Sequence, residues 1–399
     1  MERQDFIRLL SPEGQALLAQ VGPLEAKADV VKLVSSLRSQ GHDAGLVAAV
    51  LTQAKLRRRG VSKFGPFAER MIFTEAGLEQ ASRLSVAALH ANRFRQAGIG
   101  EVADLGCGIG AESMALASLD INVKAFEIDE VTAAVATYNL SPFENAFVEQ
   151  ADVTTLDLSK FEGLFFDPAR RELGGPSRER ATRKFDPAAF SPTFDFVVEA
   201  AAKKPTGVKF GPGHPHEGIP ANAEAQWVSI DGDLVELGLW FGAVARPDVK
   251  RSALLISGSA KHEIISHSAE RQDAQIGELG AFVYEPDNSV VRSHLIGQLA
   301  EQIEAHLFAP EIAYLTSDQQ LDSPWLKGYR LIDDLPFDRK KLKAHLRQLG
   351  IGVLEIKKRG ADIVPEQLRK ELQLKGSNKA TLIVTRVADT HRALLCEAL

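Results

Sequence analysis

Apolar and polar residues follow two different patterns along the chain, and the change falls near residue 98. Before that point the apolar residues recur at the three- and four-residue spacing of amphipathic helices, in segments such as IRLL, GQALLAQV, VVKLVSSLR and AGLVAAVLTQAKL. Polar residues separate these segments. The pattern predicts a small helical domain over residues 1–98.

From residue 101 onward, short apolar runs alternate with helical segments. Runs such as EVADLG, NVKAFEID, AFVEQAD, LFFD and TGVKFG are each long enough for one buried strand. Strands that alternate with helices are typical of a parallel sheet covered by helices on both faces. We therefore expect an α/β fold, with a doubly wound Rossmann-like domain over residues 99–309.

The end of the chain repeats this alternation on a smaller scale. The segments GVLEIKKR, PEQLRKELQL and ATLIVTRV indicate a strand, a helix and a strand. This part is too short for a second doubly wound domain. It predicts a small α+β domain over residues 310–399.

Composition is that of a globular protein, with 45% apolar and 25% charged residues. No apolar run approaches the roughly 20 residues that a membrane span needs. The first 30 residues contain proline and charges where a signal peptide needs an apolar segment. We expect a cytoplasmic protein with no membrane partner. Cys107 and Cys396 are too far apart in sequence to form a disulfide framework, so both are interpreted as free thiols.

Charge is distributed unevenly. Lys and Arg outnumber Asp and Glu in residues 1–98 and 310–399, whereas acidic residues dominate between them. Basic clusters attract phosphates and release counterions, so a polyanion is one explanation. A solvated helix face explains any single cluster equally well.

The segment EVADLGCGIGAESMALA predicts a ligand-binding turn between a strand and a helix. Its glycines, Gly106, Gly108 and Gly110, let polar groups of a ligand approach bare backbone and the helix N-terminus. The same spacing also satisfies the dinucleotide pattern. Asp104 favours S-adenosylmethionine over NAD, because a carboxylate would repel a pyrophosphate and attract a sulfonium and an α-amino group. A structural carboxylate with no ligand remains an alternative.

The next two strands also end in acidic residues. Glu127 is placed to accept both ribose hydroxyls of an adenosine, and Asp152 to reach an adenine amino group with Val153 lining the ring. Each residue alone is a weak signal. Three strands in chain order that each end in an acid are a stronger one, since ligands of open α/β sheets bind at the carboxyl ends of the strands.

Taken together, segment 101–168 resembles the class I S-adenosylmethionine-dependent methyltransferases. DLGCGIG, which includes Cys107, resembles their glycine motif, FEID with Ile128 their ribose motif, QAD their adenine motif and FFDPAR their fourth-strand motif. The segments at 73–94 and toward the C-terminus resemble a bacterial group with a C-terminal THUMP-like domain, distantly similar to RNA guanine-N2 methyltransferases. That resemblance implies that Thr74 and Gln80, before the first strand, help to enclose the cofactor. Helix capping and surface exposure are the alternative roles for these two residues.

The fourth-strand motif suggests the acceptor. In nucleic-acid amino methyltransferases an acid and a prolyl carbonyl orient the target amine, and an aromatic ring stacks on the flipped base. Asp167 and Pro168 match this pattern, but Ala169 replaces the second proline and Arg170 stands in place of the ring. Arg170 and Arg171 are candidates for stacking or for holding a phosphate.

We therefore expect methylation of an amino nitrogen in RNA. The THUMP-like resemblance and the basic flanks carry the RNA part, with Lys340, Lys341, Lys357 and Lys358 as candidate phosphate contacts. The alternatives are a small-molecule or protein methyltransferase, and a catalytically inert cofactor-binding protein. The sequence leaves the oligomeric state open.

Two other chemistries are disfavoured. The loop GPGHPHEG at residues 211–218 brings two histidines and a glutamate together, but without further anchored ligands, so we predict no metal. Pyrimidine C5 methylation needs a nucleophilic cysteine. Cys107 lies in the predicted cofactor turn and Cys396 near the C-terminus.

Overall fold

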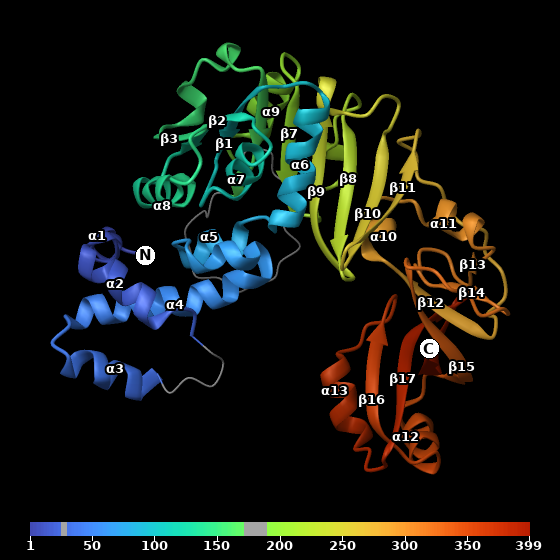
Figure 1. Ribbon diagram of the computed structural model, residues 1–399. Coiled ribbons are helices and arrows are strands. Elements are labelled where there is room, and N and C mark those ends of the chain that lie inside the picture. The colour runs from blue at the N-terminus through green and yellow to red at the C-terminus, as the bar shows by residue number, and fades with distance from the viewer. Residues whose placement is uncertain (25–29, 171–189) are drawn as a thin grey trace. The chain divides into compact units, whose positions relative to one another are not determined.

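The computed structural model describes residues 1–24, 30–170 and 190–399 (Figure 1). They form two compact units, which cut the chain at places other than residues 98 and 309. The first unit comprises Met1–Phe210, Pro215–Ala223 and Leu239–Arg246, and the second comprises Gly211–His214, Glu224–Gly238 and Pro247–Leu399. The helical N-terminal segment and strands β1 to β7 thus belong to one unit, and the division into three domains stays a prediction.

The N-terminal segment is helical, as predicted. Its elements are α1 (Arg3–Leu10), α2 (Pro12–Val21), α3 (Val30–Ser39), α4 (Ala44–Phe64), η1 (Gly65–Glu69), α5 (Glu75–Gln80) and α6 (Leu84–Gln96). Side-chain oxygens cap the N-termini of three of these helices, since Ser11 accepts a hydrogen bond from an N–H of α2, Asp43 from one of α4 and Thr74 from one of α5. No helix in the described ranges is long and apolar enough to cross a membrane.

The predicted parallel sheet follows in the first unit. Its strands are β1 (Glu101–Leu105), β2 (Asn122–Glu127), β3 (Ala146–Gln150), β4 (Gly163–Phe166) and β7 (Thr206–Phe210), with helices α7 (Ala111–Ala117), α8 (Glu130–Leu140) and α9 (Phe194–Ala201) between them. Strand β1 lies between β2 and β4, and these strands pair parallel with their neighbours. Their carboxyl ends therefore share one edge, which is where ligands of open α/β sheets bind.

The sheet has nine strands in the order β11-β10-β8-β9-β7-β4-β1-β2-β3. The additional strands are β8 (Glu224–Ile230), β9 (Asp233–Phe241), β10 (Arg251–Ser257) and β11 (Ala260–Ser266). β10 pairs parallel with β8 and antiparallel with β11. The sheet is thus mostly parallel, which confirms the α/β expectation.

A second, mostly antiparallel sheet lies in the second unit. Its order is β13-β14-β12-β15-β18-β17-β16. The strands are β12 (Phe282–Pro286), β13 (His306–Leu307), β14 (Leu315–Ser317), β15 (Leu326–Pro336), β16 (Ile351–Lys358), β17 (Asn378–Val387) and β18 (Thr390–Ala398), and the helices of this part are α10 (Asn288–Arg292), α11 (Ile296–Gln302), α12 (Arg339–Gln348) and α13 (Pro365–Leu372). α12 and α13 bury leucines in one core with β16, β17 and β18, as expected for an α+β domain.

An extended stretch of chain at residues 71–73 is buried in the first unit and belongs to no strand. Side chains of α4 bond its main chain. Gln53 accepts the Phe73 N–H at 2.9 Å through Oε1 and donates to the Phe73 carbonyl at 2.7 Å through Nε2. The buried Arg57 donates from Nε to the Met71 carbonyl at 2.9 Å. Unpaired buried peptide groups are costly, and these side chains supply the hydrogen bonds that a neighbouring strand would supply in a sheet.

Asn139 of α8 completes this arrangement. It accepts the Ile72 N–H at 2.8 Å and donates to the Ile72 carbonyl at 3.0 Å. The same amide nitrogen also lies 3.0 Å from the carbonyl oxygen of Ile109, in the glycine-rich turn after β1. One buried side chain therefore joins the N-terminal segment to the predicted cofactor turn.

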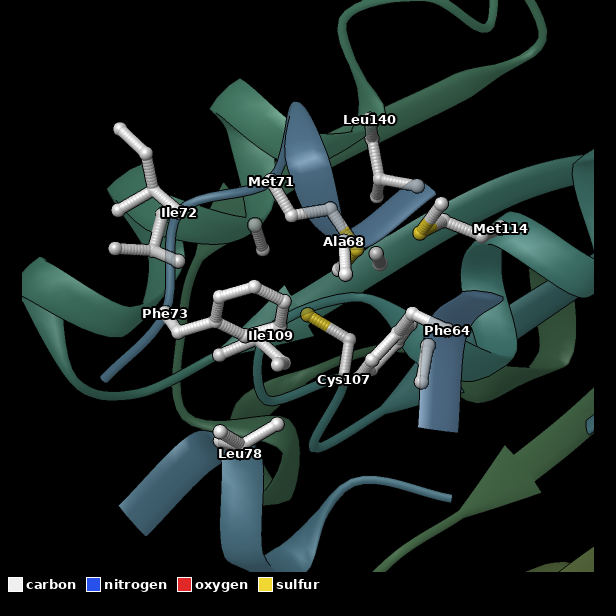
Figure 2. Close-up of a cluster of buried hydrophobic side chains, with 14 of the residues drawn as sticks. Phe64, Ala68, Met71, Ile72, Phe73, Leu78, Cys107, Ile109, Met114 and Leu140 are labelled. Atoms are coloured by element: carbon white, nitrogen blue, oxygen red, sulfur yellow. The ribbon is translucent and has the colours of Figure 1, made fainter. Parts of the chain in front are cut away.

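Hydrophobic packing joins the same two regions. Figure 2 shows side chains from both gathered in one cluster. The labelled members are Phe64, Ala68, Met71, Ile72, Phe73 and Leu78 from the segment before β1, Cys107, Ile109 and Met114 from the glycine-rich turn and α7, and Leu140 from α8. The N-terminal helices thus share a core with the turn.

Replacing Asn139 by alanine should lower the free energy of unfolding by about 2–4 kcal/mol, since it removes the partners of buried peptide groups. Urea denaturation followed by circular dichroism measures this change. Thr137→Ala, on the exposed side of α8, is the matched control and should change stability by no more than about 0.5 kcal/mol. Equal losses in the two variants would contradict the role given to Asn139.

Candidate active site

The glycine-rich turn adopts a conformation that only glycine takes up readily. Gly106, Gly108 and Gly110 have φ angles of 93°, 55° and 91°. A Cβ on Gly106 would lie 3.2 Å from the carbonyl oxygen of Asp167. The turn after β1 and the end of β4 therefore approach each other closely, which brings the predicted cofactor and acceptor residues together.

Asp104 is fully buried at the end of β1. Ser113 donates a hydrogen bond to its Oδ2 at 2.5 Å, whereas Oδ1 has no hydrogen-bond partner within the described part of the chain. Burial raises the pKa of Asp104 to about 7, and the neighbouring carboxylates of Glu112 and Asp167 add to the effect. A buried carboxylate with an unpartnered oxygen fits a cationic ligand such as the α-ammonium group of S-adenosylmethionine.

Glu127 lies at the end of β2 and faces the turn. Its Oε2 accepts the Gly108 N–H at 3.1 Å, and its Oε1 accepts the Asp129 N–H at 3.0 Å. Burial raises the pKa of its carboxyl group although these hydrogen bonds favour the charged form. The position beside the glycine-rich turn suits the predicted contact with the ribose.

Ile128 of the predicted ribose motif and the predicted adenine contacts Asp152 and Val153 lie at the same edge of the sheet. Ile128 is 60% exposed and Val153 is buried. Asp152 accepts two hydrogen bonds from Thr154 through Oδ1, so it also caps the short helix η2 (Val153–Thr155). An exposed apolar side chain next to Glu127 is consistent with a surface that a bound ring covers.

Thr74 and Gln80 lie at the two ends of α5. The hydroxyl of Thr74 accepts the Gly77 N–H at 2.9 Å, which makes it the N-cap of the helix. Gln80 is exposed. A Cβ on Gly77 would lie only 2.4 Å from Cγ2 of Ile109, so α5 packs directly on the glycine-rich turn. The expected enclosing position is thus present, while a direct contact of either side chain with the cofactor stays a prediction.

Cys107 is buried in the turn, and burial raises the pKa of its thiol well above the usual value. Cys396 is buried in the second unit, where burial raises its pKa to about 12. Neither thiol is suited to act as a nucleophile at neutral pH. Among the described residues, no three His, Cys, Asp or Glu side chains are grouped as metal ligands.

Asp167 follows β4 and forms an ion pair with Lys209 of β7, with Nζ 2.5 Å from Oδ2. Lys209 also donates to the Gln80 carbonyl at 3.1 Å and to the Ser82 hydroxyl at 3.3 Å. Sequence reasoning missed Lys209. The contact follows from the strand register, which the structure shows. Phe166 pairs with Val208, so the next residues on the two parallel strands are Asp167 and Lys209.

A buried pair of charges extends this network. Nδ1 of His90 on α6 lies 3.2 Å from Oε2 of Glu112 on α7, and both side chains are buried. Burial would raise the pKa of Glu112, but the charge and hydrogen bond of His90 outweigh it and the pKa is lowered. Ser82 also bonds to Glu112. Asp167 is therefore connected through Lys209 and Ser82 to Glu112 and His90.

The other predicted acceptor-binding residues follow Asp167 in the chain. Pro168 is buried beside Asp167, and Arg170 belongs to the two-residue strand β5 (Ala169–Arg170), which pairs with β6 (Phe190–Ser191). Arg171 lies outside the described residues.

The four predicted phosphate-binding lysines are in the second unit and differ in their surroundings. Lys340 and Lys341 are exposed in the first turn of α12. Lys357 is 2.6 Å from Oε2 of Glu285, and Lys358 donates to the Ile363 carbonyl at 2.6 Å. The first two are better placed for a phosphate, because their side chains are exposed, whereas the ammonium groups of Lys357 and Lys358 already bond to other residues.

Two family models match the chain. One is described as THUMP domain-like and covers residues 326–398, and the other is described as a domain of unknown function and covers residues 2–60. The chain is 30% identical over 345 residues to an uncharacterized S-adenosylmethionine-dependent methyltransferase in each of two Mycobacterium tuberculosis strains, covering 83% of this chain and 90% of the relative. The crystal structure of a candidate methyltransferase from Porphyromonas gingivalis W83 has the same fold, with a TM-score of 0.71, 19% identity and coverage of 94% of this chain and 98% of that one.

Binding of S-adenosylhomocysteine should depend on pH through Asp104. The pKa of Asp104 is raised, so in the free protein its contribution to stability is lost as the pH rises through about 7. A bound ammonium group favours the ionised carboxylate, so binding should release up to one proton below pH 7. The affinity should then fall by up to about tenfold for each pH unit below 7.

Calorimetry between pH 5.5 and 7.5, in buffers of different ionisation enthalpy, measures this proton release. Asp104→Asn should bind more weakly and lose the pH dependence. The exposed Asp120 is the matched control, and Asp120→Asn should behave like the unaltered protein. A pH dependence that persists in Asp104→Asn would show that another group is responsible.

Proposed function

This chain belongs to the S-adenosylmethionine-dependent methyltransferases, and we propose that it methylates an amino nitrogen of an RNA base. S-adenosylmethionine is its cofactor. The observation that carries the proposal is the position of Asp167, beside the glycine-rich turn and held by Lys209. Such a carboxylate can accept a hydrogen bond from an amine presented to the cofactor.

Methyl transfer requires the protein mainly to position the acceptor amine and the cofactor. S-adenosylmethionine, when bound, supplies an electrophilic methyl group on its sulfonium. Asp167 accepts an N–H of the target amine and thereby aims the nitrogen lone pair, with the Pro168 carbonyl as a second acceptor. The ion pair with Lys209 favours the charged form of Asp167 and fixes its Oδ2. Transfer would form the C–N bond as the methyl–sulfur bond breaks, which leaves S-adenosylhomocysteine, and the amine would lose a proton to Asp167 or to water.

The THUMP-like match supports RNA as the substrate class, together with the exposed Lys340 and Lys341 on α12. A small-molecule or protein substrate is the second candidate. It is favoured by Ala169 and Arg170, which stand where nucleic-acid amino methyltransferases have a proline and an aromatic ring. An inert cofactor-binding protein would need Asp167 to serve only as a turn residue.

Asp167→Ala should reduce methyl transfer at least ~100-fold while the affinity for S-adenosylhomocysteine changes little, because the hydrogen bond that it removes is made to the acceptor. The assay uses RNA from cells that lack the gene, with mass spectrometry of its nucleosides to identify the methylated base. Asp195→Ala, an exposed acid on α9, is the control and should retain full activity. Full activity of Asp167→Ala would reduce the Asp-Pro pair to a turn, and an unmethylated RNA pool would favour the small-molecule or protein alternative.

RNA binding should depend on salt through α12. Reversing the charges of Lys340 and Lys341 to glutamate should flatten the log–log salt dependence by roughly 0.7 for each phosphate that is no longer neutralised. Fluorescence anisotropy with a labelled single-stranded RNA measures the slope. Lys261→Glu, on an exposed part of β11, is the control. A slope that the α12 reversals leave unchanged would remove these lysines from the RNA-binding surface.

A further inference from the structure

Cations gather around residues 79–83, at the end of α5 and next to Asp167. Lys63 of α4 donates to the carbonyl oxygens of Glu79 and Ala81, both at 2.7 Å. Lys209 donates to the carbonyl of Gln80, which lies between them in the chain, and to the Ser82 hydroxyl. Two ammonium groups from distant parts of the sequence therefore hold one short segment.

Arg83 follows this segment directly and is half-buried at the start of α6. It makes no hydrogen bond or ion pair with any residue that the structure describes. Its positive charge nevertheless acts on the nearby Lys63. Burial and the neighbouring charges of Lys209 and Arg83 together lower the pKa of Lys63 to about 8, while Glu79 only partly offsets them. The cluster is thus positively charged, and within the described part of the chain Arg83 has no ion-pair partner.

We propose that Lys63 and Arg83 form a subsite for one phosphate of the nucleic acid, next to the nucleotide whose base reaches Asp167. This inference rests on the proposed function, because the phosphate would belong to the RNA. Hydrogen-bonding capacity supports the choice of residues. Lys209 already directs its ammonium hydrogens to Asp167, Gln80 and Ser82.

Lys63 and Arg83 have donors to spare. Lys63 uses two of its three ammonium hydrogens on carbonyls, and Arg83 keeps all five guanidinium N–H groups for a ligand. Lys63 bonds the chain just before Arg83, and such a lysine and arginine match a phosphate, since the guanidinium can bind two of its oxygens and the ammonium a third. The position is also suitable, because Lys209 bridges this segment to Asp167 and a nucleotide carries its phosphate and base on one sugar.

Arg83→Gln tests the proposal with little risk to folding, because the side chain bonds to no described residue. The probe is a short, mixed-sequence, single-stranded oligoribonucleotide labelled with fluorescein, followed by anisotropy at several salt concentrations. We expect the affinity to fall about 3–10-fold at low salt and the salt slope to be flatter by roughly 0.7, as for one phosphate contact. The affinity for S-adenosylhomocysteine, measured by calorimetry, should stay within about twofold.

Three further variants sharpen the test. Arg83→Lys should keep most of the affinity, because a single positive charge remains. Lys63→Gln combined with Arg83→Gln should flatten the slope no more than either change alone, since both residues contact the same phosphate. Arg70→Gln, at the exposed end of η1, is the matched control and should leave both slope and affinity unchanged.

Three results would overturn the subsite. An Arg83→Gln variant with the affinity and slope of the unaltered protein would show that no phosphate binds there. An Arg83→Gln variant that loses S-adenosylhomocysteine affinity at least tenfold, with an unchanged oligoribonucleotide slope, would assign the cluster to the carboxylate of the cofactor instead. If the unaltered protein binds no oligoribonucleotide, the RNA part of the proposed function fails and the subsite fails with it.

Discussion

The central constraint in the first unit is the burial of main chain that has no strand beside it. Residues 71–73 are satisfied by side-chain amides and one guanidinium, from α4 on one side and α8 on the other. Because each of these groups would be costly to leave unpaired, the stretch can occupy only one position. That position places α5 on the glycine-rich turn. Carbonyl oxygens at the end of α5 then accept hydrogen bonds from Lys63 and Lys209.

The second organising feature is a balance of buried charge around the end of β4. Three carboxylates, Asp104, Glu112 and Asp167, lie near His90 and Lys209 within a connected network. Glu112 has its partner, and its pKa is lowered. Asp104 has only a hydroxyl, and its pKa is raised. In the described part of the chain Oδ1 of Asp104 has no hydrogen-bond partner, so a cationic group bound beside it would favour the ionised carboxylate.

Much of this was predictable from the sequence, and the reasons for the failures are physical. Alternating apolar runs predict the parallel sheet. The carboxyl ends of parallel strands share one edge, so the positions of Asp104 and Glu127 at strand ends were enough to place them together. Lys209 could not be placed in this way, because its significance depends on which strand lies beside β4, and Asp167 is far from it in the sequence. The environments of Lys357 and Lys358 were hidden for the same reason, since the acid beside Lys357 comes from β12. Periodicity also says nothing about which helices share a core, so the packing of the N-terminal helices on the turn emerged only in three dimensions.

The double hydrogen bond of Asn139 has a consequence for how this architecture can change over generations. The first sixty residues match a family model of their own, which suggests a module that could be exchanged between proteins. Yet Gln53 and Arg57 of that region, together with Asn139 much later in the chain, are bonded to the same buried stretch. A recombination that separated them would leave peptide groups in the interior without partners. The helical segment and α8 should therefore be inherited together, and substitutions in one should be correlated with substitutions in the other.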